Sequence, residues 1–100
     1  MPLKPRRYST IRKWYYRELA AFAGIDSGQI GKHDPLSNYI GGGIAAYKAF
    51  AISLNTKPGF SGDGLNIRAN DIPNDTSTVT DLMIIIVKDY EDRNQSVELT

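Results

Sequence analysis

The chain has 100 residues, of which 41% are hydrophobic and 23% are charged, so it can form one hydrophobic core but not two, and we expect no extensive disorder. It contains no cysteine, which excludes disulfides, thiolate zinc sites and cysteine nucleophiles. The net charge is only +1, yet residues 1–20 contain six cations and one anion, whereas residues 61–100 contain three cations and eight anions.

The N-terminal part of the sequence predicts an arm followed by a helix. Residues 1–8 contain two prolines and three cations, which indicates an extended basic arm, and we expect residues 9–100 to form a single helical domain. From Ser9 onward, apolar residues recur at three- and four-residue spacing up to Gly24, which is a typical helix stop. The predicted helix covers residues 9–23, and its apolar face consists of Ile11, Trp14, Tyr15, Leu19, Phe22 and Ala23.

The middle of the chain predicts a second helix and an irregular segment. Asp34 can cap a helix and Pro35 can occupy its first turn, and apolar residues then continue on one face through residue 54. Three glycines at 41–43 interrupt this helix. Each glycine costs about 1 kcal/mol relative to alanine, so they either kink the helix or allow another backbone to approach closely. Residues 55–71 are rich in Gly, Asn and Asp, which predicts a loop or a short hairpin.

The last apolar segment, residues 79–90, is rich in β-branched residues and fits either a helix or a buried strand. We favour a helix, because Thr78 and Asp81 form a capping-box pattern. The residues that keep to one face of this helix are Val79, Met83, Ile86 and Tyr90. The predicted fold class is therefore mainly α, a small bundle of about three helices. Because this last helix is apolar almost all round, Ile84 and Ile85 are expected to contact a partner or another copy.

The opposite charges of the two ends predict contacts between copies of the chain. The basic end of one copy can meet the acidic end of the next, and such heterologous contacts close into rings. The candidate interface residues, for contact with another copy or with a partner, are Arg6, Arg7, Arg12, Arg17, Ile84, Ile85, Glu91 and Asp92. The alternative is that the charges form two solvated surfaces that never meet.

The sequence offers no catalytic or metal-binding pattern. The one histidine, His33, stands between Lys32 and Asp34 in a predicted loop, and no Ser or Cys is paired with it in a recognisable motif. We therefore predict a protein that is not an enzyme and that uses no cofactor. No apolar run approaches the ~20 residues of a bilayer span, and residues 1–7 contain no secretory signal, so we also expect no membrane partner and no cleaved leader.

A short segment, residues 19–32, resembles the helix-turn-helix pattern of small repressors, with Ala-Gly-Ile at the turn. In this interpretation residues 26–32 form a helix that enters the major groove of DNA. The candidate contacts to bases or phosphates are Ser27, Gln29 and Lys32. Gly28 and Gly31 are unfavourable inside such a helix, so a small DNA-binding regulator is an alternative function.

Three motifs follow one another between residues 23 and 93. They are Ala23-Gly24-Ile25-Asp26, then Asp34-Pro35-Leu36 with Tyr39-Ile40 and Ala45-Ala46-Tyr47, and finally Pro73-Asn74-Asp75 leading to Tyr90-Glu91-Asp92-Arg93. In this order they resemble the small head–tail connector (adaptor) proteins of tailed bacteriophages.

The resemblance implies a helical, structural protein of the virion neck, made in the host cytoplasm. Such a protein forms an oligomeric ring that docks to the portal protein and to tail proteins, and DNA passes through the ring without sequence-specific binding. An unrelated oligomeric accessory protein is a further alternative.

Overall fold

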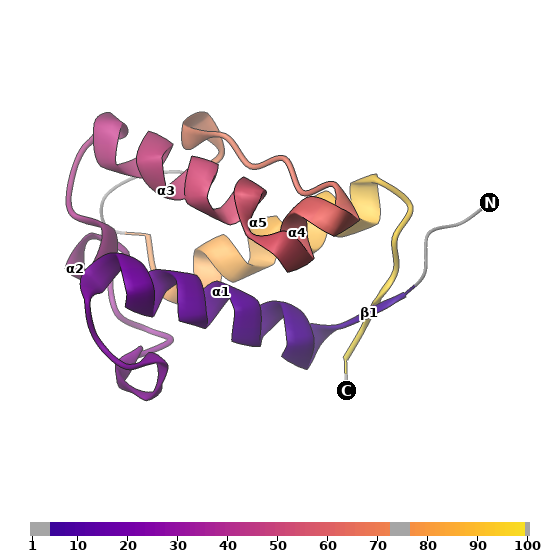
Figure 1. The fold of residues 1–100 in the computed structure, drawn as a ribbon, viewed down its shortest axis with the longest axis horizontal. Coiled ribbons are helices and arrows are strands. Elements are labelled where there is room, and N and C mark those ends of the chain that lie inside the picture. The colour runs from indigo at the N-terminus through magenta and orange to yellow at the C-terminus, as the bar shows by residue number, and fades with distance from the viewer. Residues whose placement is uncertain (1–4, 73–76, 100) are drawn as a thin grey trace.

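The computed structural model describes residues 5–72 and 77–99, and it is mainly helical, as predicted (Figure 1). In chain order its elements are β1 (Arg6–Arg7), α1 (Tyr8–Ala23), the 3-10 helix η1 (Ser27–Gln29), α2 (Ser37–Ile40), α3 (Ile44–Thr56), α4 (Pro58–Asp63), the 3-10 helix η2 (Ala69–Asp71), α5 (Val79–Asp92) and β2 (Val97–Glu98). The long helices α1, α3 and α5 supply most of the core. Residues 1–4 of the predicted arm and the Pro73-Asn74-Asp75 motif lie outside the described residues.

Helix α1 begins at Tyr8, one residue before the predicted start, and ends where the sequence predicts. Gly24 adopts a left-handed conformation with φ 73°, and its N–H donates a hydrogen bond to the carbonyl of Ala20. The fully buried residues of the predicted apolar face are Ile11, Tyr15 and Leu19. Local spacing and a glycine stop were therefore sufficient to define this helix.

The three glycines at 41–43 break the second predicted helix instead of kinking it. Gly41 has φ 88° and Gly43 has φ 101°, a range that residues with a side chain rarely adopt. The chain therefore turns between α2 and α3, and both helices pack against α1. Asp34 is not the predicted cap, because its carboxylate accepts a hydrogen bond from the Tyr39 hydroxyl at 2.6 Å, and Leu36 occupies the N-cap position of α2.

The segment 55–71 contains a helix that its composition did not predict. Pro58 stands in the first turn of α4, and buried Phe60 packs edge-on against Trp14, with 5.4 Å between the ring centroids. After α4 the chain is irregular up to η2, and the side-chain amide of Asn55 bonds to the backbone of Ile67 as a neighbouring strand would. It donates to the carbonyl of Ile67 at 2.7 Å and accepts from the Ile67 N–H at 2.9 Å. The hairpin alternative is wrong, since the described part of this segment forms none.

Helix α5 confirms the helical interpretation of the last apolar segment. The Thr78 hydroxyl accepts a hydrogen bond from the Asp81 N–H at 3.2 Å, and the Asp81 carboxylate accepts one from the Thr78 N–H at 2.9 Å. The residues predicted to share its inner face, Val79, Met83, Ile86 and Tyr90, are all buried. On the opposite side Ile84 keeps 60% of its surface exposed, so the described chain leaves this side of α5 uncovered.

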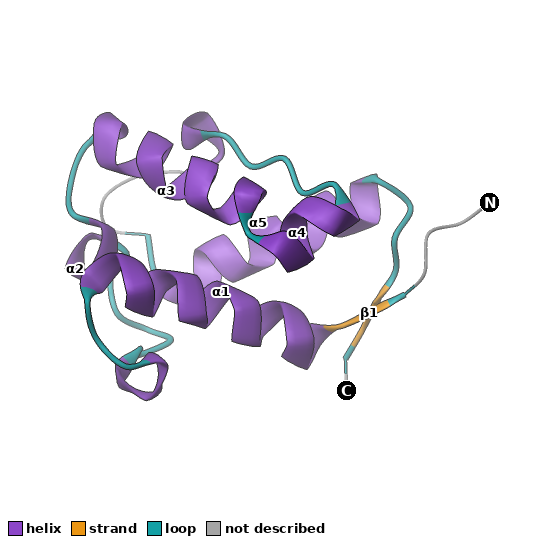
Figure 2. Ribbon diagram, in the orientation of Figure 1, coloured by secondary structure: helices purple, strands orange, loops and turns teal. Residues whose placement is uncertain are grey.

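The two short strands meet at one end of the molecule, close to both limits of the described chain (Figure 2). Strand β1 pairs in parallel with β2, so that Arg6 lies opposite Val97 and Arg7 lies opposite Glu98. Two residues per strand are too few for a sequence pattern, and the pairing was not predicted. The arm is extended at residues 6–7, as expected, but it is docked on the C-terminal segment.

Candidate functional site

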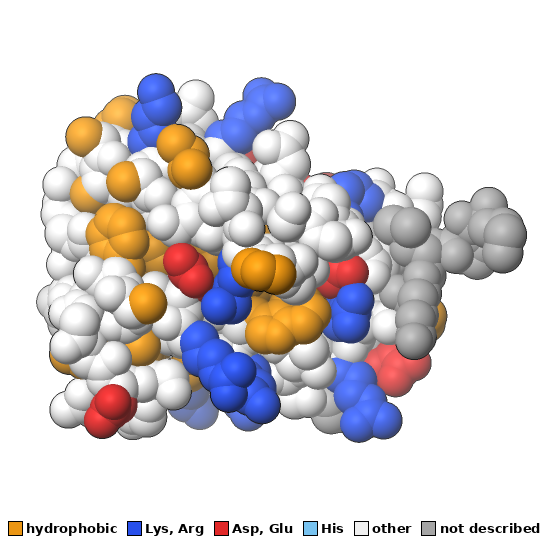
Figure 3. All heavy atoms as spheres, viewed as in Figure 1, with side chains coloured by type: hydrophobic (Ala, Val, Ile, Leu, Met, Phe, Trp, Pro, Cys, Tyr) orange, Lys and Arg blue, Asp and Glu red, His pale blue; other side chains and the backbone are white. Residues whose placement is uncertain are grey.

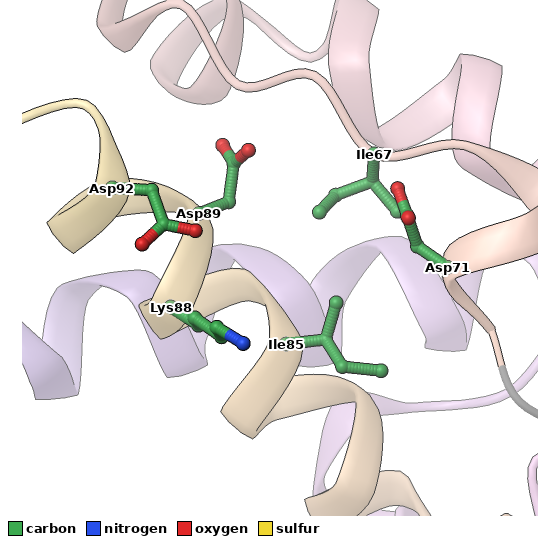
Figure 4. A pocket seen from close by; sticks show the side chains of 6 residues that line it. All are labelled: Ile67, Asp71, Ile85, Lys88, Asp89 and Asp92. Atoms are coloured by element: carbon green, nitrogen blue, oxygen red, sulfur yellow. The ribbon is translucent and has the colours of Figure 1, made fainter.

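The exposed side of α5 borders two shallow grooves that share Lys88. The apolar groove has a volume of about 330 Å³ and is lined by Tyr8, Ile84, Val87, Lys88, Glu91 and Leu99. The acidic groove has a volume of about 260 Å³ and is lined by Ile67, Asp71, Ile85, Lys88, Asp89 and Asp92 (Figure 4). The structure thus divides the predicted interface residues of α5. Ile84 and Glu91 line the apolar groove. Ile85 and Asp92 line the acidic groove.

The apolar groove forms where α5 meets the two ends of the described chain. Tyr8 begins α1 and Leu99 follows β2, so the pairing of the strands brings both residues to α5. Leu99 is 83% exposed and Ile84 is 60% exposed. Exposed aliphatic side chains that lie together are candidates for contact with another protein. Sequence reasoning missed Tyr8 and Leu99, because only long-range pairing places them here, whereas Val87 follows Ile84 at helical spacing.

The acidic groove lies between α5 and the segment around η2, and its carboxylates have different surroundings. Asp71 accepts a hydrogen bond from the Arg68 N–H at 2.9 Å, and Asp89 accepts one from the Arg93 guanidinium at 2.9 Å. Asp92 is exposed and forms no ion pair with any residue in the described ranges. No group of His, Cys, Asp and Glu side chains in the described part of the chain is suited to hold a metal ion.

Arg6, which the sequence predicts as an interface residue, forms an ion pair within the chain. Its guanidinium donates two hydrogen bonds to the Asp63 carboxylate, from Nε at 3.0 Å and from Nη2 at 2.6 Å. It also lies 5.1 Å from the centroid of the Trp14 ring, and the Tyr90 hydroxyl donates to the same carboxylate at 2.7 Å. These four residues form the Asp63 cluster, which fixes β1 to α4 and α5. Asp63 stands in a Gly-rich segment with no local signal, so sequence reasoning did not select it.

Charge and burial in the Asp63 cluster change the proton affinity of its members. Burial acts to raise the pKa of Asp63, but the hydrogen bonds from Arg6 and Tyr90 outweigh it and hold that pKa below its ordinary value. Burial, together with the adjacent Asp63 carboxylate, raises the pKa of Tyr90 far above its ordinary value. Asp63 is therefore ionised and Tyr90 is a neutral donor at neutral pH, as a stabilising ion pair requires.

The other predicted basic residues of the N-terminal region are exposed. Arg7 belongs to β1, whereas Arg12 and Arg17 project from α1, and none of the three forms an ion pair within residues 5–72 and 77–99. Figure 3 shows Lys and Arg side chains gathered over the part of the surface where α1 runs in Figure 1. Glu91 is likewise exposed and without an ion pair to any described residue.

The helix-turn-helix prediction is wrong in its second helix. Ser27 and Gln29 belong to the three-residue helix η1, and Lys32 lies in the turn after it. The Gln29 side chain accepts a hydrogen bond from the Asp26 N–H at 3.0 Å, so it serves the local backbone. A Cβ at Gly31 would collide with the carboxylate of Asp34, and residues 30–34 form no helix. The three residues therefore do not form a reading surface for the major groove.

No helix among the described residues is both long enough and apolar enough to cross a membrane. Comparison of the chain with protein-family models, with curated proteins and with solved structures gave no match.

Proposed function

We propose that this protein is a structural component of the neck of a tailed bacteriophage virion, in which copies assemble into a ring that docks to the portal and joins head to tail. The observation that carries the proposal is the exposed apolar groove around Ile84 and Leu99, next to acidic side chains without a partner in the described chain. Hydrophobic contact supplies affinity at such a surface, and the charges around it supply specificity and orientation.

The motifs that resemble connector proteins support the proposal mainly through the fold. Tyr47 and Tyr90, which belong to two of these motifs, are buried, and the Gly24 motif ends α1. Glu91 and Asp92 from the last motif are the exceptions, since both are exposed on α5. The resemblance thus concerns both the core and the acidic surface.

A ring needs two different surfaces on each copy. The cations of α1 and the acids of α5 meet this requirement, because they lie on different helices and are not neutralised by one another in the described chain. A contact between such unlike surfaces is heterologous, and it closes into a ring when the rotation between neighbours is a whole fraction of a full turn.

Assembly should depend on Ile84. The wild-type protein is expected to sediment as a closed oligomer at micromolar concentration, whereas Ile84→Asp should shift it toward monomer. Burying an isoleucine contributes about 1.5–3 kcal/mol, so the dissociation constant of each contact should rise about 10- to 100-fold. Sedimentation velocity over a concentration series, with electron microscopy of the oligomer, measures both size and closure. A central channel would also distinguish a neck ring from an unrelated oligomeric accessory protein.

The matched control is Ile52→Asp. Ile52 is 54% exposed on α3, so it resembles Ile84 in chemistry and exposure but lies outside both grooves. The control should assemble like the wild type. A wild-type chain that stays monomeric throughout the series, or two variants that dissociate equally, would contradict the proposed interface.

Charge reversal tests which surfaces meet. Reversal of the basic surface by Arg17→Glu should weaken assembly, and so should reversal of the acidic surface by Glu91→Lys with Asp92→Lys. The variant that carries all three substitutions should recover part of the loss, because its two surfaces remain complementary. Each exposed pair contributes about 0.2–1 kcal/mol, and the effect should fade with salt, since exposed charges are screened beyond about 10 Å at 0.1 M. Sedimentation at low and high salt provides the measurement. Reversals that leave assembly unchanged at low salt would show that these charges belong to solvated faces.

A further inference from the structure

The start of α1 and the 3-10 helix after it border a third depression, which includes Arg12 from the basic surface of α1. This basic hollow has a volume of about 350 Å³ and is lined by Ser9, Arg12, Lys13, Tyr16, Ser27 and Gly28. It brings together two residues that the sequence assigned to different functions, Arg12 as an assembly residue and Ser27 as a DNA contact. Five of its six lining residues carry a charge or a hydroxyl group.

The charged and hydroxyl groups of the basic hollow suit an anion. Arg12 and Lys13 are both exposed, and neither forms an ion pair with another described residue. Burial raises the pKa of Tyr16, so its hydroxyl keeps its proton and can donate a hydrogen bond. The Ser27 hydroxyl is a second donor on the other wall. Two cations and neutral hydroxyl donors around one depression are the groups that bind the oxygens of a phosphate.

We infer that the basic hollow binds a phosphodiester group of the nucleic acid backbone and does not read the base sequence. Arg17 follows Lys13 by four residues and therefore lies one helical turn further along the same face, about 6 Å away. One DNA strand presents a phosphate about every 3.4 Å along its axis, so the hollow and Arg17 are spaced for phosphates one or two steps apart on one strand. No recognition helix accompanies the hollow, because Gln29 is bonded to its own turn. Contacts to phosphates alone fix position without specifying sequence.

Nucleic acid fits these observations better than a membrane surface. A segment that lies on a membrane needs a continuous face of large apolar side chains beside its cations, whereas Tyr16 is the one large apolar side chain among the residues that line the hollow. The role of the site rests on the proposed function, since the DNA that passes through the ring would be its ligand. The binding itself is a property of the single chain, so it can be measured whether or not the ring forms.

The test compares two double variants that each remove two exposed cations. Arg12→Ala with Lys13→Ala empties the hollow of charge, whereas Lys48→Ala with Arg68→Ala changes the net charge equally at a groove beside α3. Fluorescence anisotropy with a labelled duplex of random sequence gives the affinity between about 50 and about 200 mM salt. The hollow variant should bind at least tenfold more weakly and lower the slope of log K against log salt by about 2, whereas the control should change little.

A third variant changes the hollow without removing a cation. A side chain at Gly28 meets nothing within 4 Å and the backbone there has no left-handed φ, so Gly28→Glu should fold normally and place a carboxylate in the hollow. Circular dichroism checks the fold, and the variant should lose DNA binding as the double variant does. Equal losses in the hollow and control variants would overturn the inference in favour of diffuse charge.

Two further arms separate the remaining outcomes. Vesicles of phosphatidylserine and phosphatidylcholine that bind through Arg12 and Lys13, while DNA does not bind, would overturn the inference in favour of a membrane ligand. A single consensus selected from a random DNA pool would overturn it in favour of a regulator. Sedimentation of each sample distinguishes the two proposals. A monomeric chain that binds DNA through the hollow would support the phosphate site and contradict the proposed ring. A ring that binds no DNA would support the ring and contradict the phosphate site.

Discussion

Replacing Ile86 with Asp should unfold the protein. Ile86 is completely buried on the inner face of α5, and the introduced carboxylate would have to be desolvated or protonated inside the core. An unpaired polar group in such a place costs several kcal/mol, which is comparable with the total stability of a domain of this size, about 5–15 kcal/mol at most. Far-ultraviolet circular dichroism at 25 °C and urea denaturation should show lost helicity and no cooperative transition.

The matched control lies on the same helix. Ile84→Asp introduces the same carboxylate two residues away, at a side chain that is 60% exposed, so it should keep the helicity and the urea midpoint of the wild type while assembly weakens. The pair separates the two sides of α5, one required for folding and one available for contact. An Ile86→Asp variant with an unchanged midpoint would show that α5 is not packed as described.

The second large effect is expected from Asp63→Ala. The Asp63 side chain is only 7% exposed and accepts hydrogen bonds from Arg6 and from Tyr90, so its removal leaves donors without a partner. Breaking a buried pair costs about 3–5 kcal/mol, but Arg6 is 31% exposed and regains water, so we expect a loss of about 2–3 kcal/mol. Urea denaturation at pH 7 measures the loss. Asp92→Ala, at an exposed acid, should change stability by less than about 0.5 kcal/mol.

The same variant should alter the response to acid. Hydrogen bonds and the Arg6 charge hold the pKa of Asp63 below its ordinary value of 3.8, so the folded state binds this proton more weakly than the unfolded state. The contribution is fully present above the ordinary value and is lost as pH falls through the lowered pKa. The stability difference between wild type and Asp63→Ala should therefore narrow below pH 3.8. A difference that stays constant down to the lowest pH at which both fold would show that Asp63 is not stabilised as a carboxylate.

The sequence alone determined the elements whose signals lie within a few residues of one another. Gly24 ended α1 because a left-handed residue closes a helix from within its own last turn. Thr78 and Asp81 began α5 because a capping box joins residues three apart. Most of the buried face of each long helix followed from the same periodicity, but Phe22 and Ile44, which share the predicted apolar faces, are 39% and 70% exposed. These are local interactions, so their pattern is complete in the sequence.

The tertiary structure decided every feature that joins distant residues. The sequence shows that Arg6 carries a positive charge. Only the packing of the chain shows that the Asp63 carboxylate, 57 residues later, pairs with it. The pairing of β1 with β2 brings Leu99 beside Ile84, and the folding of η1 against α1 joins Ser27 to Arg12 in one hollow. Such contacts depend on how the helices pack as a whole. Residue type therefore predicted which side chains are able to bind, while the packing of the chain determined which remain available to do so.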